Sequence, residues 1–131
     1  MSRREIAPPV LAFLTAHLSN VEQFQLLLHV MQTEDRWWDS HTVSRELGIP
    51  EADARAALDH LAKHNLLDIR ITGDVRYQFR PGTAELDAGA RACVLEFRRA
   101  PVDVLAAVTR GASTSVRDFA DAFRIRRHDD R

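Results

Sequence analysis

Two spacings of hydrophobic residues divide the central stretch of the chain, residues 36–80. In its first part, apolar side chains recur every three or four positions, as at Val43 and Leu47 and again at Leu58 and Leu61. Such a spacing places side chains on one face of a helix, so this part predicts two consecutive amphipathic helices. In its last part the spacing falls to every second residue, which predicts β-strands.

Residues with particular backbone preferences indicate where these helices begin and end. Asp39 or Ser40 can accept a hydrogen bond from the first turn of the first helix. Gly48 tolerates the left-handed backbone with which many helices end, and Pro50 has the φ angle of a helix start. Asn65 can end the second helix, since asparagine adopts positive φ more readily than most residues. We therefore expect two helices joined by a tight turn.

Two alternating runs follow the second helix. The first extends from Leu67 to Ile71 and the second from Val75, and both alternate apolar with polar residues, as half-buried strands do. Gly73-Asp74 lies between them and predicts the turn of a β-hairpin. Trp37-Trp38 predicts a short additional strand paired with this hairpin. Because neighbouring strand residues point to opposite faces, one tryptophan should be buried, and the other should be a lid over the core or an anchor for a partner.

The order of strand, helix, turn, helix and hairpin over residues 36–80 resembles the winged helix-turn-helix family, whose hairpin is called the wing. The resemblance implies a mostly α-helical fold with a small β-hairpin, in which the helix over 50–64 enters the major groove of DNA. The flanking helices are similar, in general plan, to those of small dimeric bacterial regulators of the multiple-antibiotic-resistance type. That family's wing carries an Asp-x-Arg pattern, which Asp74-Val75-Arg76 matches, whereas the residues from Tyr77 onwards differ from it.

The segments outside the central stretch predict further helices within one domain. The chain has 131 residues, enough for one domain of typical size. We expect a single domain in which residues 1–19 form an extra N-terminal helix, 20–80 the winged-helix module, 81–125 packing or dimerisation helices, and 126–131 a frayed tail. Helices beyond the module must bury their apolar stripes somewhere, which predicts a homodimer.

Composition and the single cysteine indicate the expected setting. Hydrophobic residues make up 45% of the chain, enough for a buried core. No apolar run reaches the roughly 18 residues of a membrane span, and the N-terminus lacks the pattern of a signal peptide. One cysteine cannot form an internal disulfide, which fits a cytoplasmic protein. Cys93 falls in an apolar stripe, where we expect a packed and unreactive thiol.

The distribution of charge leaves two classes of function open. The formal net charge is −1, the isoelectric point is about 6.6, and residues 36–80 carry seven basic and seven acidic side chains. DNA-binding domains often have a basic excess, because neutralising phosphates supplies much of their affinity. A winged-helix adaptor that binds another protein, without sequence-specific DNA binding, is therefore the alternative to a DNA-binding regulator.

Signatures of enzymes are absent from the sequence. It contains no Gly-rich phosphate loop, no GxSxG elbow, no metalloprotease His-Glu motif and no cysteine cluster. We therefore expect no catalytic residues and no cofactor. His60 and His64 are four residues apart and could share a metal with His41 or Asp59. Helical histidines are more often ordinary surface positions, so we expect no metal site.

Under the DNA-binding hypothesis, each part of the module has a role. Arg55 is the candidate for a base edge, since a guanidinium can pair bidentately with guanine, and the small residues beside it allow close approach. Side chains of the first helix and of the hairpin would hold the DNA backbone. Glu51, Asp53 and Asp59 oppose this role, because their charges repel phosphate. The candidate DNA-binding residues are Ser44, Arg45, Ala52, Arg55, Ala56, Lys63, Arg70, Arg76 and Arg80.

A dimer or partner interface is predicted from apolar and aromatic residues, most of them in the flanking segments. Phe119 and Phe123 lie on one face of a predicted last helix and are the expected anchors. The candidate interface residues are Leu11, Leu14, Trp38, Phe97, Phe119 and Phe123.

Overall fold

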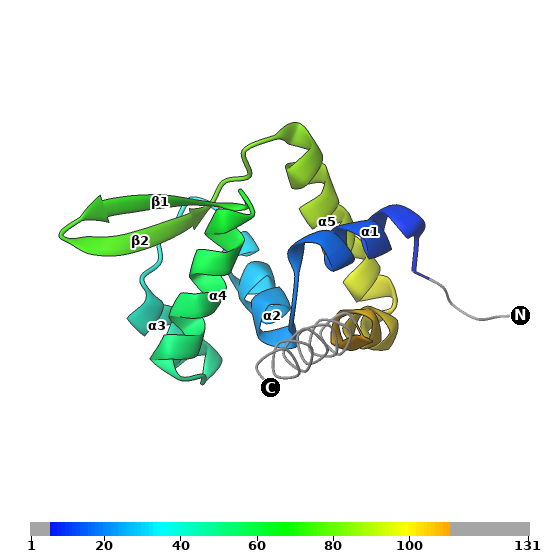
Figure 1. Cartoon of the computed structure of the whole chain (residues 1–131), viewed down its shortest axis with the longest axis horizontal. Helices are drawn as coiled ribbons and strands as arrows, with labels where there is room; N and C mark the ends of the chain where they lie inside the picture. The colour runs from blue at the N-terminus through cyan, green and yellow to red at the C-terminus, as the bar shows by residue number, and fades with distance from the viewer. Residues whose placement is uncertain (1–5, 111–131) are drawn as a thin grey trace, which may run out of the picture.

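The computed structural model describes residues 6–110, and Figure 1 shows how the elements are arranged. Helices make up most of these residues, and a two-stranded antiparallel hairpin extends from them. In chain order the elements are α1 (Pro8–His17), α2 (Val21–Met31), α3 (Ser40–Leu47), α4 (Glu51–Lys63), β1 (Leu67–Thr72), β2 (Asp74–Phe79) and α5 (Ala84–Arg99). Residues 101–110 are also helical. The mostly α-helical fold with a small β-hairpin that the sequence predicts is confirmed.

The turn between α3 and α4 follows from local residue preferences. Asp39, rather than Ser40, caps α3 by accepting a hydrogen bond from the backbone N–H of Thr42 at 2.7 Å. α3 ends at Gly48, whose φ of 71° lies in the left-handed region. Pro50 is the N-cap of α4, so this helix begins one residue later than the sequence predicts. These residues fix where the two helices stop and start.

α2 forms the centre of the hydrophobic core. It packs against α4 and against β2, and its Phe24, Leu27 and Val30 are fully buried. Leu58 of α4 and Val43 of α3 are buried in the same cluster. Burying a leucine of this kind contributes about 2 kcal/mol relative to leaving it exposed. The apolar stripes read from the sequence therefore hold α2, α3 and α4 together.

α1 packs against α5 within the same chain. Its buried side chains are Val10, Phe13 and Leu14. Gly89 of α5 makes the close approach possible, because a Cβ at this position would come within 2.5 Å of the Phe13 ring. Leu11, in contrast, is 41% exposed. Most of the apolar stripe predicted for the N-terminal helix is therefore buried inside one chain rather than between two.

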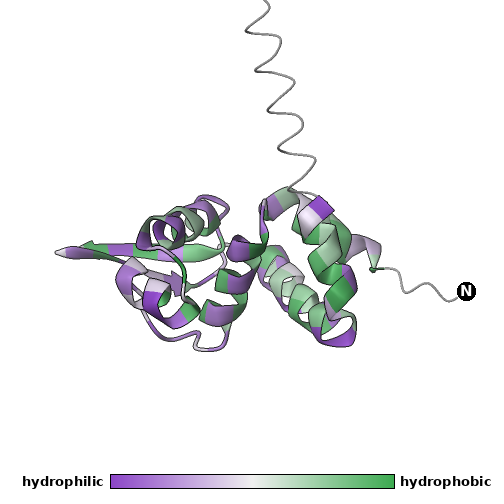
Figure 2. Ribbon diagram, turned by 90° about the horizontal axis from the view of Figure 1, so that it is seen from below, coloured by the Kyte–Doolittle hydropathy of each residue, from purple (hydrophilic) through white to green (hydrophobic). Residues whose placement is uncertain are grey.

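The hairpin is buried at its base and exposed at its tip. The antiparallel register places Leu67 opposite Phe79 and Ile71 opposite Val75, so these apolar residues share one face. Leu67 and Phe79 are buried, whereas Ile71 is 72% exposed. The prediction of half-buried strands is wrong for the tip, because the hairpin extends beyond the helices that could cover it (Figures 1 and 2).

The additional strand predicted at the tryptophans is a single bridge between Trp38 and Tyr77. The two residues exchange two backbone hydrogen bonds, of 2.7 and 2.8 Å. Trp38 is the buried tryptophan, with 2% of its surface exposed, and Trp37 is half-buried. The expectation that one ring is buried and the other lies nearer the surface is confirmed.

Some expectations concern residues beyond 110. Phe119 and Phe123, and the tail expected at 126–131, lie outside the described residues. Within residues 6–110, none of the helices is both long and apolar enough to cross a membrane. Cys93 is buried, and burial raises the pKa of its thiol to about 12, as expected of an unreactive cysteine.

Candidate nucleic-acid interface

One face of α4 is buried and the opposite face is open to solvent. The buried face includes Leu58 and packs on α2 and α3. Asp59, on the other side of the helix, is exposed together with four predicted DNA-binding residues. These four are Ala52, Arg55, Ala56 and Lys63. We call the five exposed residues the open face of α4.

A hydrogen bond links the open face of α4 to the hairpin. The hydroxyl of Tyr77 donates to Oδ1 of Asp59 at 2.5 Å. Burial raises the pKa of Tyr77 to about 12, Asp59 adds to the increase, and the nearby Arg55 guanidinium opposes it. Arg55 therefore lies where α4 meets the hairpin. This contact could not be predicted from the sequence, because its two partners are 18 residues apart in separate elements.

The three arginines of the hairpin have different partners. Arg76 and Arg80 are each paired with an aspartate of the same hairpin, at 3.1 and 3.4 Å. Arg70 instead stacks on the ring of Trp37, with its guanidinium carbon 4.4 Å from the ring centroid. The sequence contains equal numbers of basic and acidic residues over residues 36–80. At Arg76 and Arg80, this equality corresponds to specific ion pairs with aspartates.

The two candidates on α3 differ in their availability for a phosphate. The hydroxyl of Ser44 donates to the carbonyl of Ile49 at 2.6 Å. A serine has one proton to donate, so Ser44 uses it inside the turn between α3 and α4. Arg45 is exposed, so its guanidinium is accessible to a ligand.

Three histidines meet where the end of α1 contacts α4, and we call this contact the histidine junction. Nδ1 of His17 lies 3.0 Å from Nδ1 of His64, and Nε2 of His60 lies 2.7 Å from the carbonyl oxygen of His17. Burial lowers the pKa of His17 and of His64, and the neighbouring His60 lowers both further. In residues 6–110, no group of three or more His, Cys, Asp or Glu side chains is arranged to hold a metal ion.

The four predicted interface residues that lie within residues 6–110 differ in their exposure. Leu14 and Trp38, two of the residues predicted for an interface with another chain, are each only 2% exposed. Both side chains are buried by packing within one chain. Leu11 remains accessible on α1, and Phe97 is half-buried at a groove between two helices.

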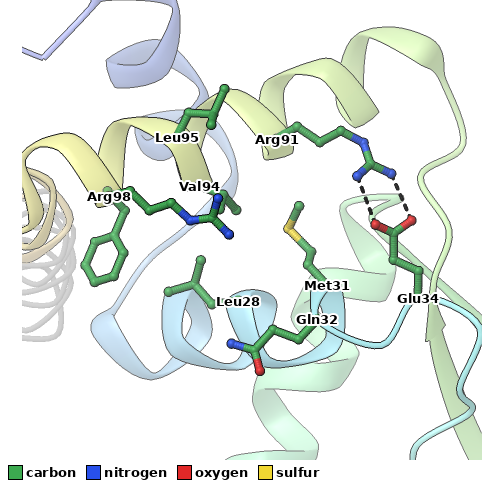
Figure 3. A pocket seen from close by; sticks show the side chains of 9 residues that line it. Leu28, Met31, Gln32, Glu34, Arg91, Val94, Leu95 and Arg98 are labelled. Atoms are coloured by element: carbon green, nitrogen blue, oxygen red, sulfur yellow. Dashed lines mark hydrogen bonds and ion pairs between the residues drawn. The ribbon is translucent and has the colours of Figure 1, made fainter.

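This groove has a volume of about 540 Å³ and lies between α2 and α5 (Figure 3). Its apolar lining includes Leu28, Leu95 and Phe97. At one end, the guanidinium of Arg91 donates two hydrogen bonds of 2.9 Å to the carboxylate of Glu34, which joins α5 to the segment after α2. Leu95 is 63% exposed, and the sequence pattern did not single it out.

Comparison with known proteins does not assign the chain to a family. No family model, no curated protein and no solved structure matches it. The function therefore has to be inferred from the residues and contacts of this chain alone.

Proposed function

We propose that the protein is a winged helix-turn-helix transcriptional regulator that binds DNA as a homodimer. One observation carries the proposal: the open face of α4 lies beside a projecting hairpin that bears three arginines. This arrangement agrees with the one that the resemblance to winged-helix proteins implies. An α-helix fits the major groove of DNA, and adjacent arginines can contact the backbone on either side of it.

In the proposed complex, the open face of α4 is turned toward the bases. Ala52 and Ala56 are small enough for the helix backbone to approach closely, and either can contact a thymine methyl group. Arg55 pairs with the edge of a guanine, and it lies close enough to Tyr77 to lower the pKa of the phenol. These contacts would select a sequence, whereas the hairpin arginines would supply affinity without selecting one.

The charges of the hairpin and of the whole chain determine the affinity of the proposed binding and its dependence on salt. Two of the three hairpin arginines are paired with aspartates, and the net charge of the chain is −1. Exposed ion pairs of this kind are worth about 0–1 kcal/mol, so a phosphate can replace the carboxylate partner at small cost. We therefore propose binding that is moderate in affinity and weakens steeply as salt is added.

The proposed dimer uses the outer side of α5 and the helix that follows it. Leu95 is 63% exposed and Val102 is 76% exposed. Leu95 lines the apolar groove, and exposed apolar residues at such a groove are typical of a surface that another chain covers. Twofold symmetry would then present two copies of α4 to half-sites about 34 Å apart along DNA.

The alternative function, a winged-helix adaptor for another protein, is favoured by a different observation. The tip of the hairpin exposes Ile69 by 43% and Ile71 by 72% on its apolar face. Exposed apolar side chains on a strand suit a protein partner better than a phosphate. In this alternative the hairpin binds the partner and α4 reads no sequence.

Binding to fragmented DNA from the protein's own genome, across a salt series, tests the proposed function. We expect selective retention of a few fragments, with affinity falling steeply as salt rises. Arg55→Ala should lose the preference among fragments and cost about 1–3 kcal/mol at the preferred site, because it removes the contact to a base. Arg45→Ala is the matched control, and it should weaken binding evenly. Absence of retention even at low salt would favour the adaptor.

A further inference from the structure

The guanidinium groups of the hairpin are held in two different ways. Those of Arg76 and Arg80 are held by carboxylates, through hydrogen bonds and ion pairs. That of Arg70 is held by the face of the Trp37 ring. Within residues 6–110, Arg70 has no carboxylate at ion-pairing distance. The hairpin therefore carries one arginine whose positive charge is not offset by an acidic partner.

Stacking on a ring leaves the hydrogen-bonding capacity of an arginine intact. The ring contacts the flat face of the guanidinium, while the N–H groups lie in its plane and point outward. A carboxylate partner, in contrast, occupies some of the N–H groups. Arg70 is exposed, so its outward N–H groups are accessible to a ligand.

The position of Trp37 is fixed by its neighbour. Trp38 exchanges two backbone hydrogen bonds with Tyr77, which holds this part of the chain against β2. Since adjacent residues of an extended segment point to opposite sides, Trp37 lies on the polar face of the hairpin. Arg70 lies on that face too, directly opposite Arg76 in the register of the two strands.

We propose that Trp37 is a positioning residue, which holds the Arg70 guanidinium as the principal contact of the hairpin to a DNA phosphate. The proposal rests on the proposed DNA-binding function and adds the residue on which the backbone contact depends. Because the ring already restricts the arginine side chain, less conformational freedom is lost when the phosphate binds. Trp37 itself need not touch the DNA.

Variants at both positions test the proposal by binding to one duplex that the wild-type protein retains. Arg70→Ala should weaken binding and reduce the slope of log K against log salt by about 0.9, the contribution of one phosphate contact. Trp37→Leu keeps an apolar side chain but removes the aromatic face, and should weaken binding about two- to fivefold. Trp37→Phe keeps an aromatic face and should restore most of the affinity. Arg76→Ala is the matched control and should change the slope less.

A double-variant cycle shows whether Trp37 acts through Arg70. Trp37→Leu should have no further effect on binding once Arg70 is alanine, because the side chain that it positions is gone. An equal loss in both backgrounds would show that the ring acts in another way and would overturn the proposal. An unchanged salt slope for Arg70→Ala would also overturn it.

The proposed function and this inference can fail separately. If the wild-type protein binds no DNA at low salt, the proposed function fails and the inference fails with it. If the wild-type protein binds selectively while Trp37→Leu binds equally well, only the inference fails. Thermal unfolding of each variant, measured in parallel, shows that a loss of binding does not come from a loss of folded protein.

Discussion

At the scale of a single residue, Tyr77 is the side chain through which the hairpin is hydrogen-bonded to α4. Tyr77 is 1% exposed, and its hydroxyl donates a hydrogen bond to the carboxylate of Asp59 on the open face of the helix. Removing the phenol proton would place a second negative charge beside Asp59 in a buried site, which is unfavourable. The protonated phenol is therefore part of the contact between the hairpin and α4.

The first prediction concerns the titration of this phenol. Tyr77 is the single tyrosine of the chain, so the absorbance of phenolate reports on it alone. We expect a pKa of about 12, against an ordinary value of 10.0. The contribution of Tyr77 to the free energy of unfolding should be fully present below pH 10.0 and should be lost as pH rises toward 12, because the unfolded chain releases the proton first. Asp59→Asn should lower the midpoint but leave it above 10.0, since burial is the larger cause.

At the scale of elements, the histidine junction connects α1 to α4. Two imidazoles with facing Nδ1 atoms can share one proton in a hydrogen bond, but they repel each other when both are charged. His60 adds to this repulsion at both histidines, and Lys63 adds to it at His64. The contact between the two helices therefore depends on neutral histidines.

The second prediction is that acid weakens this junction. The pKa values of His17 and His64 are lowered from 6.5, so the contribution of these two residues to the free energy of unfolding should be constant above that pH. Below it, stability should fall, because the unfolded chain binds protons that the folded junction excludes. Urea unfolding between pH 7 and about 5 should show a shallower dependence for His64→Gln. An equal change in His41→Gln, a variant away from the junction, would show that the effect is not specific to it.

The third prediction contrasts the two ends of the hairpin. Phe79 is 4% exposed and Ile71 is 72% exposed, although both lie on the apolar face. Phe79→Ala should cost about 3–5 kcal/mol because it leaves a cavity. Ile71→Thr should change the free energy of unfolding by no more than about 0.5 kcal/mol, because the side chain is already in water. Urea denaturation measures both, and a large loss at Ile71 would mean that another chain covers the tip.

At the scale of the whole molecule, the fourth prediction concerns the proposed dimer. Leu95→Glu should give a folded monomer, because this exposed side chain makes few contacts within its own chain. Leu14→Glu should instead unfold the protein, since it places a charge in the core. Sedimentation measures the mass, and circular dichroism measures the fold. An unchanged dimer in Leu95→Glu would show that this surface is not the interface.

The sequence alone predicted the features of the fold that depend on residues close together along the chain. Periodicity and capping residues such as Asp39 and Gly48 located the helices to within a residue or so. The sequence alone did not predict the burial of residues that lie where segments distant in the chain come into contact. The burial of Leu14 depends on α5, and the exposure of Ile71 depends on where the helices end, so neither can be read from spacing.

For the candidate site, too, local features could be predicted from the sequence, whereas contacts between distant segments could not. The exposed face of α4 could be predicted, because helical periodicity separates Arg55 from Leu58. The partners of the charged side chains could not, because Arg70 and Trp37 come together only when the hairpin folds back on the bridge at Trp38. A count of charges therefore described the balance correctly but did not indicate which of the three hairpin arginines has no carboxylate partner within residues 6–110.

The segment between α2 and α3 is fastened at both ends. Glu34 is bound to Arg91 of α5, and four residues later Trp38 is bound through its backbone to Tyr77 of β2. A displacement of the hairpin would therefore be passed through this short connection to α5 and to the groove beside it. A ligand that displaced the hairpin in this way would alter the surface offered to a second chain, and by thermodynamic reciprocity the second chain would alter the affinity for that ligand.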